Sequence, residues 1–219
     1  MSIAENITKF KDEIPEEVTL VAISKTKPVD DILEAYNAGQ RIFGENKIQE
    51  MTEKWEKLPK DIKWHMVGHV QRNKVKYMAE YVDLIHAVDS LKLLREIEKQ
   101  AKKYDRTISC LLQIKIAEED TKYGIDVDEA KSILQSNAYR KMTHVKVVGL
   151  MGMATFTEKE EKVRKEFSFL KTTFEDLKSE YNSFSILSMG MSGDYKIAID
   201  CGSTMVRIGS SIFGERNYN

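Results

Sequence analysis

A lysine just after an apolar segment is the first residue whose position suggests chemistry. Lys25 follows the run from Val18 to Ile23, which is predicted to be a buried strand. Desolvation at such a place disfavours the charged form of an amine, and the neutral amine is the form that condenses with a carbonyl group. Taken by itself, however, the context of Lys25 favours an ordinary surface lysine in a loop.

Small residues follow two predicted strands near the C-terminus. Ser192 lies in a turn after one of them, and Gly209 and Ser210 follow the strand predicted for Met205 to Ile208. Backbone N–H groups and hydroxyls in such turns bind phosphate. Either turn could also have been chosen for its backbone geometry only. Because the loops after the last two strands of a (β/α)₈ barrel are a recurrent phosphate site, the two turns together favour phosphate binding.

Two more polar residues lie at strand ends. Arg207 precedes Gly209 by two positions, so strand alternation puts both on one face. A permanently charged guanidinium there needs an anion or a strong acceptor, which a ligand or a structural salt bridge would supply. Asn46 follows the strand that ends near Phe43, and it fits a ligand contact and a helix cap equally well.

No metal site or disulfide is predicted. His65 and His69 flank a strand end, but two imidazoles without a third ligand do not make a zinc site. We expect satisfied or stacking histidines there. Cys110 and Cys201 lack zinc spacing, and we expect both to be buried free thiols in a reducing compartment.

The elements that must position these residues alternate between short apolar and longer amphipathic segments. Eight strands that alternate with helices in 219 residues predict one TIM-type (β/α)₈ barrel domain over residues 1–219, with an extra N-terminal helix. An open doubly wound sheet is the alternative, but no Gly-x-Gly-x-x-Gly follows the first strand. The predicted strands are 18–23, 41–43, 64–67, 84–88, 108–116, 145–151, 185–188 and 205–208. The predicted helices are 30–38, 45–57, 71–79, 91–103, 128–134, 158–180 and 195–200.

Composition excludes several classes of partner. The chain has 34 basic and 35 acidic residues, which gives no electrostatic footprint for nucleic acid or an acidic membrane. No apolar run approaches the roughly 20 residues of a membrane helix, and the polar N-terminus is not a signal peptide. We expect a soluble, cytoplasmic protein.

Six motifs, in order along nearly the whole chain, resemble the pyridoxal 5'-phosphate (PLP) homeostasis protein family. They are Ser24–Pro28 (SKTKP), Phe43–Asn46 (FGEN), His65–His69 (HMVGH), Gly149–Met151 (GLM), Ser188–Ser192 (SMGMS) and Ser203–Gly209 (STMVRIG). The resemblance implies a barrel related to the N-terminal domain of alanine racemase. It also implies that PLP is the cofactor and forms a Schiff base with Lys25.

The resemblance implies roles for other residues as well. It places the PLP phosphate at Ser192, Gly209 and Ser210, Arg207 at the pyridine nitrogen, and Asn46 among the cofactor-binding residues. Lys122 resembles a second lysine that the family keeps near the cofactor. The chain departs from the family at Lys47, Val70 and Thr121, where tyrosine, leucine and serine are common. The departure at Thr121 weakens the assignment of Lys122.

The expected function is a PLP carrier in intracellular vitamin B6 homeostasis, with indirect effects on amino-acid and keto-acid metabolism. An arginine at the pyridine nitrogen keeps it unprotonated, which suits racemisation or no catalysis. Racemisation needs an acid or base on each face of the substrate, and the chain ends before the second domain that supplies one in alanine racemase. We therefore expect a monomer, no enzyme activity, and PLP-requiring apo-enzymes as transient acceptors. The alternatives are a PLP-dependent amino-acid racemase and a barrel that binds another phosphorylated metabolite.

Overall fold

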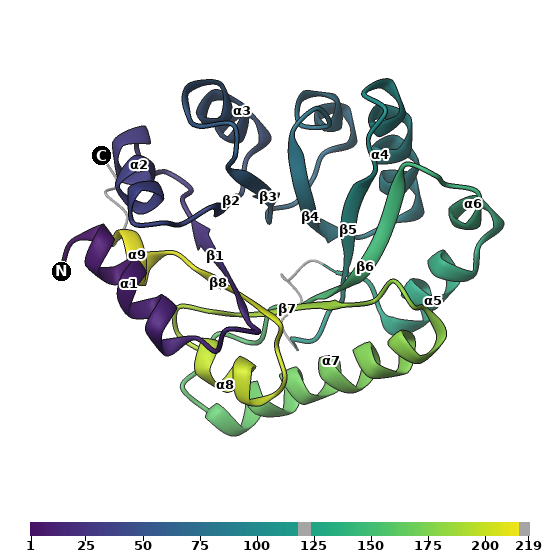
Figure 1. The fold of residues 1–219 in the computed structure, drawn as a ribbon. Coiled ribbons are helices and arrows are strands. Elements are labelled where there is room, and N and C mark those ends of the chain that lie inside the picture. Colours follow the sequence, from purple (N-terminus) through teal and green to yellow (C-terminus); the bar gives the residue numbers. More distant parts are fainter. Residues whose placement is uncertain (118–123, 215–219) are drawn as a thin grey trace.

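The computed structural model describes residues 1–117 and 124–214, which form a closed barrel of eight parallel strands (Figure 1). Each strand pairs with the next along the chain, and the first pairs with the last, with Thr19 opposite Met205 and Ala22 opposite Ile208. The strands are β1 (Thr19–Ile23), β2 (Ile42–Glu45), β3 (Lys63–Met66), β4 (Val82–Val88), β5 (Ile108–Gln113), β6 (Val145–Met151), β7 (Ile186–Met191) and β8 (Met205–Ile208). The predicted TIM-type barrel is confirmed.

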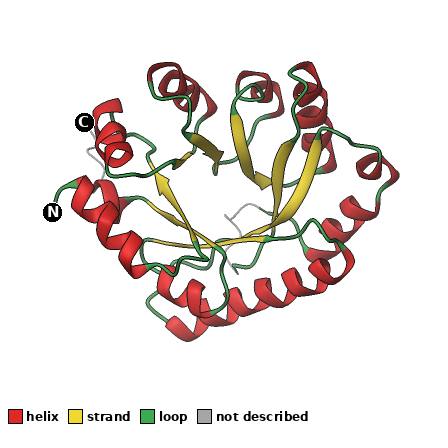
Figure 2. Ribbon diagram, in the orientation of Figure 1, coloured by secondary structure: helices red, strands yellow, loops and turns green. Residues whose placement is uncertain are grey.

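Helices surround the strands on the outside of the barrel (Figure 2). The predicted N-terminal helix is present and begins with a capping box, in which Ser2 and Glu5 each accept a hydrogen bond from the other's backbone N–H. The helices are α1 (Ile3–Glu13), α2 (Val29–Asn37), α3 (Ile48–Lys57), the 3₁₀ helix η1 (Arg72–Tyr77), α4 (Leu91–Lys103), α5 (Val127–Gln135), α6 (Asn137–Arg140), α7 (Glu160–Glu180), α8 (Tyr195–Asp200) and α9 (Ser210–Phe213).

Side chains alternate across the barrel wall, so the strands build two apolar layers. The outer layer, between strands and helices, holds the largest buried side chains, which include Trp64, Phe43, Phe167 and Phe174. The inner layer is a smaller cluster of buried residues, Val21, Leu84, Ala87, Leu111, Val148, Met151 and Met205. The interior of the barrel is therefore a packed core rather than a channel.

The structure corrects several predicted boundaries. Glu45, predicted to open a helix, instead ends β2, because its side chain is buried and bonded to Ser24 and Lys54. The segment 71–79, predicted as an α-helix, forms the shorter η1. The strand predicted for 108–116 ends at Gln113, and Ile114 makes an isolated bridge to Ile125. Strand β7 extends beyond Ser188 as far as Met191. The short helices α6 and α9 were not predicted.

The described residues contain neither a membrane-spanning helix nor a group of side chains that could bind a metal ion. No helix in 1–117 or 124–214 is long and apolar enough to cross a membrane. Within the same ranges, no group of three His, Cys, Asp or Glu side chains could hold a metal ion. Both cysteines are free thiols, and Cys110 is buried as predicted. The prediction of burial is wrong for Cys201, which is partly exposed and forms the C-cap of α8.

Candidate functional site

Five of the six residues predicted to form the site lie at one rim of the barrel. Lys25 follows β1, Asn46 follows β2, Ser192 follows β7, and Gly209 and Ser210 follow β8. Strand β1 pairs with both β2 and β8, and β8 pairs with β7, so these four strands form one continuous part of the wall. The carboxyl ends of parallel strands face the same way, so the tertiary structure brings the ends of these four strands together on one arc of the rim.

The two turns predicted to bind phosphate are in direct contact. The backbone N–H of Gly209 donates to Oγ of Ser192 over 3.3 Å. An added Cβ at Gly209 would lie only 3.2 Å from both Cβ and the carbonyl oxygen of Ile23. The turn after β8 therefore closes against the end of β1, two residues before Lys25. Glycine suits this position because a side chain would crowd the backbone there.

Arg207 is 5% exposed and points into the barrel. Its guanidinium donates to Oγ of Ser188 over 2.6 Å and to the carbonyl oxygen of Gly152 over 3.0 Å. Burial lowers the pKa of Arg207 to about 10, and the charge of Asp194 opposes this shift. The ion pairs found among the described residues do not include Arg207, so the structural salt bridge is not supported. A buried cation held by neutral acceptors is suited to an electron-rich ligand atom.

A chain of buried polar groups leads from Arg207 across the barrel. Oγ of Ser188 lies 3.0 Å from Nδ1 of His86, and Nε2 of His86 lies 3.0 Å from Nδ1 of His65. Nε2 of His65 lies 3.5 Å from a carboxylate oxygen of Asp83, which is half exposed. Burial lowers the pKa of both histidines, which favours their neutral forms.

The donors along this chain follow from chemistry, because a guanidinium only donates. Ser188 accepts from Arg207, and the carboxylate of Asp83 at the other end of the chain can only accept, so with both imidazoles neutral the O–H of Ser188 donates to His86. Each neutral imidazole then accepts at Nδ1 and donates from Nε2, and the last donor meets the carboxylate of Asp83. These tautomers are inferred from the network. The chain fixes the orientation of Arg207 from inside the barrel.

Neither His86 nor Ser188 was predicted to belong to such a chain. Alternation along β4 offers a signal, since His86 lies two positions after the inward-facing Leu84. The expectation of a satisfied histidine is confirmed for His65, which is buried and bonded. His69 is separate and exposed, with Nδ1 3.5 Å from a carboxylate oxygen of Asp89.

Asn46 is partly buried, and it is not the helix cap that the sequence left open. The N-cap of α3 is Lys47, which makes no capping hydrogen bond through its side chain. An added Cβ at Gly68 would lie 2.3 Å from the carbonyl oxygen of Asn46, so the loop after β3 packs tightly on this residue. The backbone of Asn46 is therefore held in place by this packing. Lys122 and Thr121 lie outside the described residues.

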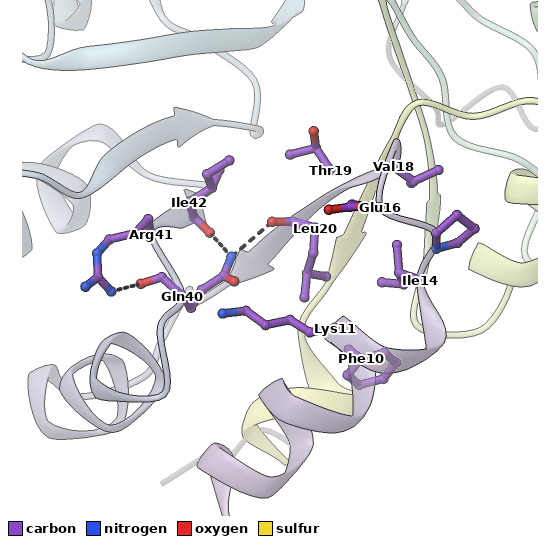
Figure 3. Close-up of a pocket in the computed structure, with 11 residues that line it drawn as sticks. Phe10, Lys11, Ile14, Glu16, Val18, Thr19, Leu20, Gln40, Arg41 and Ile42 are labelled. Atoms are coloured by element: carbon purple, nitrogen blue, oxygen red, sulfur yellow. Dashed lines mark hydrogen bonds between the residues drawn. The ribbon is translucent and has the colours of Figure 1, made fainter.

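A cavity of about 270 Å³ lies at the opposite end of the barrel (Figure 3). It is lined by α1 and by the first residues of β1 and β2, including Thr19 and Ile42. The amide of Gln40 there donates to the carbonyl oxygens of Leu20 and Ile42 over 3.0 and 2.7 Å. In TIM barrels this end contributes to stability and the other end carries the chemistry. The cavity is therefore separate from the candidate site.

Comparison with known proteins shows which family the chain belongs to. The sequence matches the family described as "Alanine racemase, N-terminal domain" over residues 1–217. A "Pyridoxal phosphate homeostasis protein" of Aquifex aeolicus (strain VF5) is 40% identical over 201 residues, with 91% of this chain and 87% of the relative covered. The chain belongs to the PLP homeostasis protein family. A second member, from Escherichia coli (strain K12), is 36% identical over 234 residues and covers 99% of this chain and 98% of its own length.

Solved structures agree with membership of the PLP homeostasis protein family. PipY of Synechococcus elongatus PCC7942, solved with PLP bound, superposes with a TM-score of 0.89 at 32% identity, over 97% of this chain and 100% of PipY. Alanine racemase of Clostridium difficile 630 superposes with a TM-score of 0.76 at 16% identity, over 100% of this chain and 57% of the racemase. The second likeness shows that the barrel fold is shared.

Proposed function

We propose that this chain binds PLP as a Schiff base through Lys25 and takes part in intracellular PLP homeostasis. The observation that carries the proposal is the arrangement of the rim, where the Lys25 segment, the contact between Ser192 and Gly209, and the inward-pointing Arg207 occupy one arc. The family name and the PLP-bound structure of PipY support the same ligand.

The donor groups fit the three reactive parts of PLP. The amine of Lys25 would condense with the aldehyde carbon, with loss of one water. Ser192, Gly209 and Ser210 would hold the phosphate with hydroxyl and N–H groups. Arg207 would donate to the pyridine nitrogen, and Asn46 would contact the cofactor from β2. When bound, PLP supplies a reactive aldehyde and an electron-accepting ring.

The charge on Arg207 decides what the bound cofactor is suited for. With its pKa at about 10, the guanidinium stays charged at neutral pH. A second positive charge on the adjacent ring nitrogen is then disfavoured, which limits the delocalisation of a substrate carbanion. This favours storage of PLP and remains compatible with the alternative, a PLP-dependent amino-acid racemase. We further propose a single-domain, cytoplasmic monomer that passes PLP to apo-enzymes and so influences amino-acid and keto-acid metabolism indirectly.

Borohydride trapping tests the ligand and the residue together. Purified protein mixed with PLP is expected to show a visible absorption band, and borohydride is expected to fix the label on the peptide that contains Lys25. Lys25→Ala is expected to lose the band and keep its far-UV circular dichroism, whereas the control Lys47→Ala, at an exposed position, keeps both. A wild-type protein that stays colourless, or a label on another lysine, would contradict the proposal.

The racemase alternative has its own experiment. The PLP-loaded protein is incubated with single L-amino acids, and the appearance of the D-enantiomer is followed by chiral chromatography. The carrier predicts no sustained turnover. Many turnovers per protein molecule would instead establish the racemase.

A further inference from the structure

The backbone just before Lys25 is bonded to a buried group of charged side chains. The ammonium of Lys54 donates to the carbonyl oxygen of Ser24 over 2.8 Å, to Oε1 of Glu45 over 2.8 Å and to Oε1 of Glu50 over 2.7 Å. The hydroxyl of Ser24 donates to the same oxygen of Glu45 over 2.6 Å. Ser24 is therefore held through both its side chain and its backbone. Glu45, Glu50 and Lys54 are called the clamp below.

The backbone just after Lys25 is bonded to the same clamp. The N–H of Thr26 donates to Oε1 of Glu50 over 2.5 Å, and the N–H of Lys27 closes a turn onto the carbonyl oxygen of Ser24 over 3.0 Å. Thr26 has φ of 63°, in the left-handed region that β-branched residues rarely adopt. Such a conformation persists only where the surrounding structure over-determines it.

The clamp is not expected to contribute much to the stability of the fold. Lys54 is 6% exposed and Glu45 is fully buried, so both ionisable groups have left water. Oε2 of Glu45 is buried without a hydrogen-bond partner. Burial of paired charges is often no better for stability than apolar packing, and an unsatisfied oxygen adds a further cost. Stability of the barrel therefore does not account for this arrangement, which suggests another role for the clamp.

We propose that Glu45, Glu50 and Lys54 are positioning residues that fix the backbone on both sides of Lys25 and so hold its amine in reach of the PLP aldehyde. The inference rests on the proposed function. A lysine on a loose loop would spend most of its time in unproductive directions, and fixing its backbone removes that entropic cost before PLP arrives. The clamp lies behind the loop, on the β2 and α3 side, and acts only through Ser24 and Thr26.

Substitution of Glu50 tests the clamp with little risk to the fold, because its side chain is already 24% exposed. The measured quantity is the rate at which the visible band forms after PLP is mixed with the protein. Glu50→Ala removes the acceptor for Thr26 and is expected to slow the rate about ten- to a hundred-fold. Glu50→Gln keeps an acceptor oxygen and is expected to recover most of the rate. Glu53→Ala, at an exposed position on the same helix, is the matched control and should behave as wild type.

A second probe separates positioning from damage to the pocket. Pyridoxine 5'-phosphate has the same ring and phosphate but no aldehyde, so it binds without condensing with the amine of Lys25. Its dissociation constant, measured by calorimetry, is expected to stay within about two-fold of wild type in Glu50→Ala. The proposal would be overturned if Glu50→Ala weakened binding of this analogue by as large a factor as it slows band formation with PLP. It would also be overturned if the rate with PLP were unchanged.

A variant of the loop itself covers the case in which Glu50→Ala fails to fold. Thr26→Gly places a residue that tolerates positive φ at the strained position and releases the loop, so it should fold and still form the band several-fold more slowly. A Thr26→Gly protein as fast as wild type would overturn the proposal. A wild-type protein that forms no band at Lys25 would instead refute the proposed function itself.

Discussion

Ser188→Ala is the sharpest test of the buried chain behind Arg207. The substitution removes the hydroxyl that accepts from the guanidinium over 2.6 Å and that faces His86 over 3.0 Å. A buried donor left unsatisfied costs about 1–3 kcal/mol, and the histidine loses a neutral hydrogen bond of about 1 kcal/mol. The expected loss in the free energy of unfolding is therefore about 2–4 kcal/mol. In a chain of this size that corresponds to a fall in Tm of roughly 4–16 °C.

Urea unfolding of the ligand-free protein measures this loss. Ser179→Ala is the matched control, because Ser179 is an exposed serine near the end of α7, and its free energy of unfolding should change by less than about 0.5 kcal/mol. A Ser188→Ala variant as stable as this control would refute the chain as a structural element.

A double-mutant cycle then tests whether Arg207 is the residue with which Ser188 interacts. Arg207→Met removes the buried charge and the donor to Ser188 while it keeps most of the volume, and it is expected to weaken PLP binding. In that background Ser188→Ala should cost less than in the wild type, with a coupling energy between about 0.5 and 3 kcal/mol. A coupling energy of zero would show that Ser188 and Arg207 do not act together.

Three further predictions follow from burial and packing. Burial raises the pKa of Glu45 from 4.5 to about 7, so its contribution to stability is present below pH 4.5 and is lost as the pH rises through 7. Glu45→Gln should therefore gain up to about 3 kcal/mol relative to wild type between pH 4.5 and 7.5 in urea unfolding, and a constant difference would contradict this. Gly149→Ala should prevent folding, because the new Cβ would lie 1.7 Å from the carbonyl oxygen of Ile186, whereas Gly193→Ala, with nothing within 4 Å, should fold normally by circular dichroism. Phe167→Ala should cost about 3–5 kcal/mol in thermal or urea unfolding, and a loss below 1 kcal/mol would show that the outer layer repacks.

The alternation of short apolar and longer amphipathic segments was enough to predict the barrel. Strand β6 and helix α4 begin and end at the predicted residues, because each is a strong periodic pattern with clear ends. Boundaries failed where a long-range contact decided them. Glu45 belongs to β2 rather than to the next helix because Ser24 and Lys54 bind its carboxylate. No local sequence pattern predicts that these three side chains meet.

Three features could be predicted from the order of residues: the eight-strand count, the rim positions of Lys25, Ser192 and Gly209, and the family motifs that link them to PLP. The contacts of Gly209 with Ser192 and Ile23, and the chain of histidines that orients Arg207, became visible only in the folded barrel. Closure of the barrel explains this difference. The pairing of β1 with β8 joins opposite ends of the chain, and short-range periodicity carries no information about which distant side chains then meet.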